Sequence, residues 1–283
     1  MCYIVETLLM LQDWRISADG KCLQVVGLCL FHISTSTFTM LLPVELIDHI
    51  FSFLQKDSSA LKACSKAHRS LSRVAERHLY AHIIIPEVFN HDDLENPHLL
   101  DYPRTLEFRI CPSHTLLSFM RMIPRMANLV CLKIYAPISY DEKFIPMLRN
   151  CLQQSSLQEL LLSHIHNLPF SIFDDAKYIK HLTFSGCKAD DEEQISSSPS
   201  SQLSLETLIL SGYSNLHIHR WAARWVTSLT LLELQKPRLG LDWTVFPELL
   251  VACSNSLTKL HLDMNNYCLW FLSLISFKFT HTS

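Results

Sequence analysis

The sequence predicts an α/β protein in which a small helical module precedes a solenoid of short parallel strands with helices on its outer side. Three observations favour this class. A helical pattern led by a proline begins near Leu41, a leucine motif recurs six times between residues 129 and 262, and only five of the 283 residues are glycine. A chain of this length can form one small and one larger domain.

Composition and charge exclude several functional classes. A hydrophobic fraction of 48% is typical of a folded chain, and 24 basic against 27 acidic residues give a net charge of -3. Because no basic excess exists to neutralise a phosphate backbone, we expect no nucleic-acid partner. The five glycines are too scattered to write a dinucleotide-binding or phosphate-binding loop, so we expect no cofactor of those kinds.

The cysteines and histidines do not show the spacing of a metal site. Ten cysteines occur without a C-x-x-C pair, which predicts buried thiols in a reducing, intracellular compartment, cytoplasm or nucleus. The pairs His164/His166 and His217/His219 have no third ligand nearby, so we expect no metal. Apolar stretches at both ends are too short to span a bilayer, and we expect no membrane association.

A helical module is expected over residues 40–85. Pro43 suits the first position of a helix, and Glu45 suits its first turn. Asp57 is a candidate N-cap for a second helix, and helical spacing continues to about Ala81 with a break near 65–67. The first helix carries one broad apolar face, formed by Leu46, Ile47, Ile50, Phe51 and Leu54.

The order Leu42-Pro43-x-Glu45-Leu46-Ile47, continued by Ile50-Phe51-Ser52-x-Leu54 and by Ala60-Leu61-Lys62-Ala63-Cys64-Ser65, resembles the F-box, in the form common among fungal F-box proteins. This resemblance implies docking on a Skp-type adaptor, which bridges to a cullin-RING ubiquitin ligase. The adaptor-facing residues that it implies are Leu42, Pro43, Leu46, Ile47, Ile50, Leu54, Leu61 and Cys64. The same stripe also fits the ordinary core face of an amphipathic helix, and it is the family spacing that favours docking.

The pattern L-x-x-L-x-L recurs at intervals of 22 to 28 residues, with copies that begin at Leu129, Leu157, Ile179, Leu205, Leu229 and Leu257. A weaker copy covers Pro103 to Phe108. The fourth and sixth positions of each copy are expected to point inward, where stacked repeats bury a shared core. The pattern resembles leucine-rich repeats of irregular length, as found behind many F-boxes, with Cys187 and Asn265 at the ninth position.

We therefore expect an extension outside the fold at 1–39, a linker at 86–102, a solenoid at 103–266 and an apolar tail at 267–283. Convex helices are expected over 139–154, 218–226 and 246–253, and a solvated acidic and serine-rich insertion over 190–201. The third, fifth and seventh positions of each strand should form a concave binding surface. Its expected target-binding residues are Glu159, Leu161, His181, Ile209, Leu231, Glu233, Lys259 and His261, with Thr183 and Asp263 beside them.

Together the two resemblances imply a non-enzymatic substrate receptor of an SCF-type ubiquitin ligase, in which the helical module binds the adaptor and the repeats bind a target protein. An alternative is a non-catalytic leucine-rich-repeat scaffold whose helical segment caps the solenoid and recruits no ligase. The sequence does not identify the target.

Overall fold

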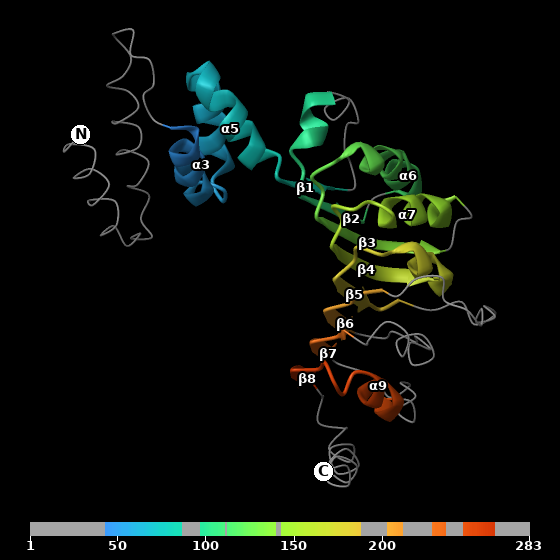
Figure 1. Ribbon diagram of the computed structural model, residues 1–283. Helices are drawn as coiled ribbons and strands as arrows, with labels where there is room; N and C mark the ends of the chain where they lie inside the picture. Colours follow the sequence, from blue (N-terminus) through green and yellow to red (C-terminus); the bar gives the residue numbers. More distant parts are fainter. Residues whose placement is uncertain are drawn as a thin grey trace. The chain divides into compact units, whose positions relative to one another are not determined.

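The computed structural model describes residues 43–86, 97–110, 112–139, 143–187, 203–211, 228–235 and 246–263. The chain divides into a helical unit, Met1–Leu79, and a sheet unit, Tyr80–Ser283. Figure 1 shows the elements of each unit. Several expectations lie outside the described residues: those for 1–39, Leu42, the insertion at 190–201, the helix at 218–226, the His217/His219 pair, Asn265 and the tail at 267–283.

The described part of the helical unit contains α3 (Val44–Phe53), α4 (Ser58–Ala67) and α5 (Arg69–Leu79). Pro43 lies one position before α3, and its carbonyl accepts hydrogen bonds from the N–H groups of Leu46 and Ile47 at 3.0 and 3.2 Å. Asp57 caps α4 as predicted, because its carboxylate accepts a hydrogen bond from the Ala60 N–H at 2.9 Å. The predicted break is present at His68, whose extended backbone (φ -157°) separates α4 from α5.

The helical unit has a small core of its own. Its buried apolar side chains come from all three described helices: Ile47, Phe51, Leu61, Cys64, Leu71, Val74 and Ala75. Ile50, Leu54 and Leu79 pack against this core and are partly buried. A core of this size gives the helical unit only a small free energy of unfolding, because a short three-helix module removes only a modest apolar area from water.

The described part of the sheet unit forms an eight-stranded sheet, in which each strand pairs in parallel with its neighbours in the sequence. The strands are β1 (His82–Ile85), β2 (Thr105–Arg109), β3 (Cys131–Ser139), β4 (Glu159–His166), β5 (His181–Ser185), β6 (Thr207–Ser211), β7 (Leu231–Gln235) and β8 (Lys259–Asp263). The six predicted repeats coincide with β3 to β8, and the weaker copy with β2. The predicted α/β class is therefore confirmed.

Two rows of apolar side chains run through the sheet in register and point to the same side. One row consists of Ile83, Leu106, Leu132, Leu160, Leu182, Leu208, Leu232 and Leu260. The other consists of Ile85, Phe108, Ile134, Leu162, Phe184, Leu210, Leu234 and Leu262. In β2 to β8 these are the fourth and sixth positions of the motif. The two rows are buried in every strand except β8, where Leu260 is 39% exposed.

Helical segments lie on the side of the sheet where these rows are buried (Figure 1). They are α6 (Ser113–Met122), α7 (Phe144–Leu152) and α9 (Phe246–Ala252), with the 3-10 segments η3 (Ile123–Arg125) and η4 (Phe170–Asp175). α7 and α9 fall within predicted helical segments, whereas α6 was not predicted. The helices and the strands share one core, in which Phe108 packs edge-to-face on Phe119 of α6 with ring centroids 5.7 Å apart.

The structure differs from the sequence prediction at the junction of the two units. The predicted helical module extends to residue 85, but the helical unit ends at Leu79, and β1 already belongs to the sheet. Ile83 and Ile85 of β1 enter the sheet core, so burial of these two side chains fixes the segment as a strand. The expected linker at 86–102 includes a 3-10 segment, η2 (Pro97–Asp101).

Candidate functional site

The outward side of α3 carries the first candidate surface, the helix face, formed by Pro43, Leu46, His49, Ile50 and Phe53. Leu46, Ile50 and Phe53 follow one another at i, i+4 and i+7, so they share one side of the helix. Phe53 is 72% exposed, and its ring meets the His49 ring edge-on at 5.0 Å. The helix face is therefore an apolar strip that the described core of its own unit covers only in part, with Phe53 as its most exposed large hydrophobic side chain.

The predicted adaptor-facing residues divide into three groups. Ile47, Leu61 and Cys64 are only 4%, 1% and 6% exposed inside the helical unit, so their assignment to a docking surface is corrected here: they hold the three helices together. Ile50 and Leu54 are half-buried at the edge of that core. Pro43 is exposed and Leu46 half-buried on the helix face. Sequence reasoning missed Phe53, although its spacing of three from Ile50 and seven from Leu46 places it on the same side.

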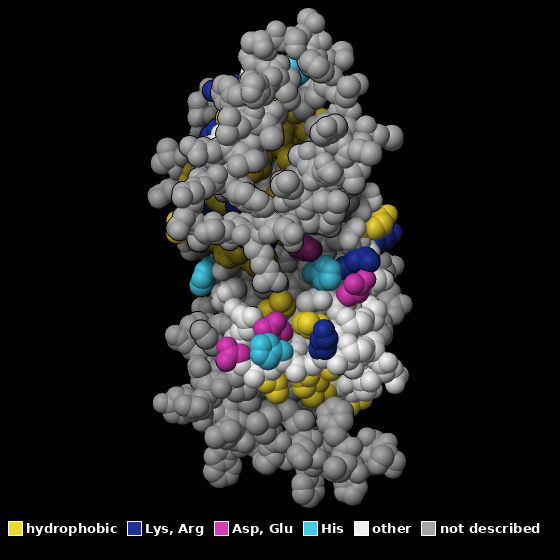
Figure 2. All heavy atoms as spheres, turned by 90° about the vertical axis from the view of Figure 1, so that its left-hand side faces the viewer, with side chains coloured by type: hydrophobic (Ala, Val, Ile, Leu, Met, Phe, Trp, Pro, Cys, Tyr) yellow, Lys and Arg dark blue, Asp and Glu magenta, His cyan; other side chains and the backbone are white. Residues whose placement is uncertain are grey.

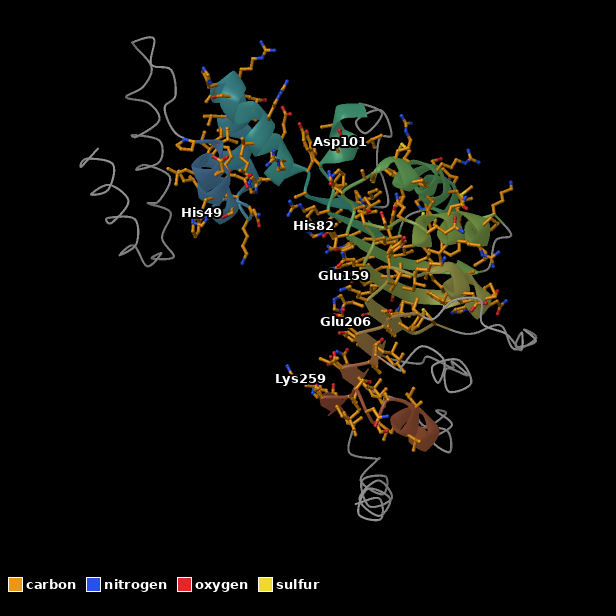
Figure 3. The ribbon with its side chains drawn as sticks, viewed as in Figure 1. His49, His82, Asp101, Glu159, Glu206 and Lys259 are labelled. Carbon is orange, nitrogen blue, oxygen red and sulfur yellow. The ribbon has the colours of Figure 1, made fainter. Side chains whose placement is uncertain are left out.

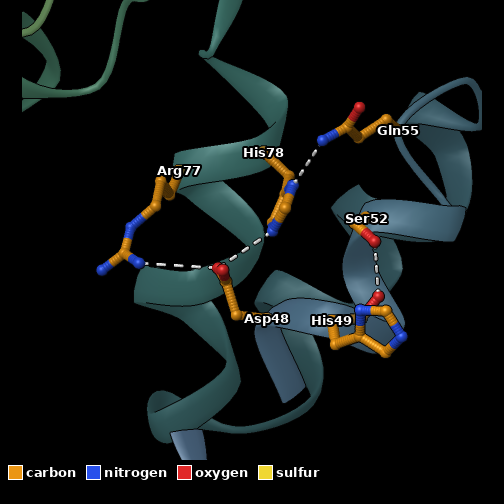
Figure 4. Close-up of polar contacts among 6 residues, drawn as sticks. All are labelled: Asp48, His49, Ser52, Gln55, Arg77 and His78. Carbon is orange, nitrogen blue, oxygen red and sulfur yellow. Dashed lines mark hydrogen bonds and ion pairs between the residues drawn. The ribbon is translucent and has the colours of Figure 1, made fainter. Parts of the chain in front are cut away.

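A polar network on the side of α3 that faces α5 fixes the orientation of the helix face (Figure 4). Asp48 on α3 contacts His78 Nε2 at 3.0 Å and Arg77 Nη1 at 3.5 Å, and both partners lie on α5. On the other side of the same ring, the Gln55 amide nitrogen lies 3.2 Å from His78 Nδ1, so His78 is held between α3 and the segment that follows it. His78 is also packed edge-on against Phe51 with ring centroids 6.3 Å apart.

The second candidate surface is the strand face, formed by the side chains of β1 to β8 that alternate with the buried rows. Figure 3 shows His82, Glu159 and Lys259 on the side of the strands away from the helices. All eight predicted target-binding residues belong to this face: Glu159, Leu161, His181, Ile209, Leu231, Glu233, Lys259 and His261. Each is half-buried or exposed. The structure therefore brings the predicted residues together on one continuous surface.

Polar contacts order the end of the strand face that β7 and β8 form. One oxygen of Glu233 accepts a hydrogen bond from Gln235 at 2.9 Å and contacts His261 Nδ1 at 2.8 Å. The Gln235 hydrogen bond lowers the pKa of Glu233, and His261 adds to the effect against a smaller opposing contribution from burial. In Figure 2, acidic, histidine and basic side chains lie beside one another and beside apolar ones on the described surface.

The opposite end of the strand face holds a buried carboxylate that sequence reasoning missed. The Glu107 side chain is only 7% exposed; Arg109 Nε donates to its Oε1, and His82 Nε2 lies 3.3 Å from its Oε2. Burial alone would raise the pKa of Glu107, but the hydrogen bond and charge of Arg109, with His82 and Lys133, hold it below its usual value. The sequence signal that could have located this group is Lys133, which occupies the fifth, outward-facing position of the motif copy that begins at Leu129 and pairs with Glu107.

The described cysteines are all buried and free: Cys64, Cys131, Cys151, Cys187 and Cys253. Burial raises the pKa of the Cys131 and Cys151 thiols to about 12 and that of Cys187 to about 11. A thiol with such a pKa is protonated near neutral pH and is a poor nucleophile or metal ligand. The Cys187 thiol donates to the Leu162 carbonyl at 3.2 Å and so links two neighbouring repeats.

The described residues include no group of three or more His, Cys, Asp or Glu side chains arranged to hold a metal ion. His164 and His166 are both exposed on β4. None of the helices within the described ranges combines the length and the apolar character that crossing a bilayer would require.

The chain matches no model of a known protein family and no curated protein. The two surfaces and the chemistry of their side chains therefore carry the functional argument.

Proposed function

We propose that the protein is a non-enzymatic substrate receptor of an SCF-type ubiquitin ligase. In this proposal the helical unit is an F-box that docks on a Skp-type adaptor inside the cell, and the sheet unit is a leucine-rich-repeat solenoid that holds a target protein. The adaptor would connect the receptor to a cullin-RING ligase, and the catalytic steps would take place on other subunits.

The single observation that supports docking most strongly is the apolar helix face. Phe53 is 72% exposed although the same unit buries Phe51, two residues earlier, to 3% exposure. Together with Leu46 and Ile50, Phe53 gives a small module an apolar strip of the kind that protein partners cover. The network of Asp48, His78 and Gln55 holds this strip in one orientation, which lowers the entropy lost on docking.

The repeat assignment rests on the register of the sheet. Each described strand from β3 to β8 contributes the fourth and sixth residues of its motif to the two apolar rows. Stacked units that bury a shared core in this way are characteristic of repeat proteins. The buried Cys187 thiol, bonded to the Leu162 carbonyl in the preceding strand, fits the ninth position of a leucine-rich repeat.

The experiment is capture of the full chain by a purified Skp-type adaptor. A double variant, Leu46→Asp with Phe53→Asp, places two charges on the helix face but avoids Ile50, which packs against the core. We expect capture to weaken by about a hundredfold or more, because each buried, unpaired charge costs at least a few kcal/mol in an interface. The matched control is Val251→Asp, since Val251 is 73% exposed on α9 of the other unit.

Circular dichroism of both variants checks that the helices are retained. Full capture of the double variant would reject the helix face as the docking surface. Failure of the adaptor to bind the unaltered chain would reject ligase recruitment, and the alternative of an interaction scaffold would then remain.

A further inference from the structure

The end of the strand face formed by β1, β2 and β3, here called the basic end, carries more positive than negative charge. Its formally charged side chains are Glu107, Arg109 and Lys133, and they leave an excess of one positive charge, to which His82 adds when protonated. Glu107 is nearly inaccessible, whereas Arg109 keeps 58% of its side chain exposed. A molecule that approaches this surface therefore meets the cations first.

Glu107 holds Arg109 in a defined position. Its carboxylate is fixed by β2 and binds the guanidinium through Nε, so the contact leaves Nη groups of the exposed guanidinium for another acceptor. A guanidinium presents its donors in a planar fork that matches a carboxylate. Because Arg109 is already ordered, less side-chain entropy is lost when a ligand binds it.

Lys133 lies beside Glu107 in the parallel register, on the neighbouring strand. Among the described residues no acidic side chain lies within ion-pairing distance of its ammonium group, although its charge acts on Glu107. Arg109 and Lys133 therefore form a pair of cations with one buried counter-charge. A single additional carboxylate would bring the group to neutrality.

Apolar side chains lie on both sides of this charge in the same row of the sheet. The order across the strands is Ile84, Glu107, Lys133, Leu161, and Ile84 is 40% exposed. Ile84 and Leu161 are separated by three strand spacings, or about 14 Å, which is close to the distance between residues i and i+4 of an extended chain. Residue i+2 of such a chain would then lie opposite Glu107 and Lys133.

We propose that the basic end binds an acidic, extended segment of the target protein, with an Asp or Glu carboxylate between Arg109 and Lys133 and an apolar residue two positions away on each side. The inference deepens the proposed function, on which it rests, because it names the class of target. A carboxylate is favoured over a phosphate because one negative charge balances the excess, whereas a phosphate dianion would leave the site negative.

The experiment pans a phage-displayed library of random peptides on the full chain and on two variants. Lys133→Glu reverses a charge at the basic end without removing a direct partner of Glu107. The matched control is Lys177→Glu, which makes the same change at an exposed turn of the same unit. We expect the unaltered chain and the control to enrich peptides with the pattern apolar, any, acidic, any, apolar, and Lys133→Glu to lose them.

A synthetic peptide from the selection then gives the magnitude. Replacing its acidic residue by the corresponding amide should weaken binding about tenfold or more, as expected for the loss of a charge-assisted contact. Equal binding of the two peptides, or the same enriched pattern on Lys133→Glu, would overturn the proposal. Absence of any acidic enrichment would also overturn it, and tighter binding of a phosphoserine peptide would overturn the choice of carboxylate.

Peptide binding needs no adaptor, and adaptor capture needs no target. If the adaptor captures the unaltered chain but the chain enriches no acidic peptides, only the basic end is rejected. If the peptides bind but the adaptor does not, the proposed ligase role fails, and the basic end remains as a binding surface for acidic segments.

Discussion

The helical unit and the sheet unit differ in how completely they bury their apolar side chains. In the helical unit α3 buries Ile47 and Phe51 but leaves Phe53 in solvent, so its outward side is apolar. In the sheet unit each strand from β2 to β7 buries at least two apolar side chains, and its outward side is mostly polar or charged. The difference teaches that the two units expose different chemistry, and it fits the two modes of recognition proposed above, one through apolar burial and one through charge.

Binding at the two surfaces should therefore respond differently to the salt concentration. Binding that depends on exposed charges weakens as salt shortens the Debye length from about 10 Å at 0.1 M to about 3 Å at 1 M, whereas apolar burial does not weaken in that way. The two units should also differ in how strongly their stability depends on single buried side chains.

The largest effect is expected from Phe184→Ala in the sheet unit. Phe184 is 1% exposed on β5 and packs edge-to-face against Phe173 of η4, with ring centroids 5.7 Å apart. Truncation leaves a cavity in a continuous core and should lower the free energy of unfolding by about 3–5 kcal/mol. Urea denaturation followed by circular dichroism measures it. A loss below about 1 kcal/mol would show that the strands do not share one cooperative core.

The next prediction compares two phenylalanines on α3. Phe51→Ala should destabilise the helical unit by about 3 kcal/mol, while Phe53→Ala should change its stability by less than about 0.5 kcal/mol, because only Phe51 is buried. Hydrogen exchange locates the effect: with Phe51→Ala, amides of α3 to α5 should lose protection while those of β2 to β7 keep it. Equal effects of the two variants would contradict the division of α3 into a core side and a helix face.

Much of this architecture could be predicted because it follows from short-range patterns. The motif L-x-x-L-x-L alternates with the period of a strand, so the inward positions of β3 to β8 could be assigned from sequence alone. The starts of α3 and α4 were near the prediction because Pro43 and Asp57 act through local backbone geometry and hydrogen bonding.

The remaining features depend on contacts between distant residues. β1 is four residues long, carries no leucine motif and follows directly on a helix, so only its pairing with β2 identifies it as a strand. Likewise, the apolar stripe of a helix does not show which of its side chains the neighbouring helices cover. α4 and α5 decide that Ile47 is buried and that Leu46, its neighbour in the chain, is not fully covered.

A smaller effect is expected at the turn after β5. Gly186 has φ +62°, and a Cβ on it would lie 2.8 Å from His164 Nδ1. Gly186→Ala should therefore cost about 1–2 kcal/mol, partly from backbone strain and partly from this contact. The double variant His164→Ala with Gly186→Ala removes the contact but keeps the strain, so it should recover part of the loss. No recovery would show that the backbone conformation alone requires glycine.

The smallest effect concerns the pH dependence contributed by Glu107. Its pKa is held below the usual value in the folded state by Arg109, His82 and Lys133 despite burial. A lowered folded pKa stabilises the fold fully above the unfolded pKa of about 4.3, and this contribution is lost as the pH falls through the folded pKa. The stability of the unaltered chain should therefore fall more steeply below about pH 5 than that of Glu107→Gln, which has no proton to take up there.

Thermal unfolding of the two proteins between about pH 7 and pH 3 measures this difference. Parallel curves would show that Arg109 and His82 do not stabilise the Glu107 carboxylate. The same comparison bears on the strand face, because Arg109 is ordered by Glu107 only while that carboxylate is ionised. Capture of acidic peptides by the unaltered chain should therefore weaken toward pH values of about 3 for two reasons: the peptide is protonated, and Arg109 is released from Glu107. In the Glu107→Gln chain the release of Arg109 cannot depend on pH, so only protonation of the peptide should weaken capture.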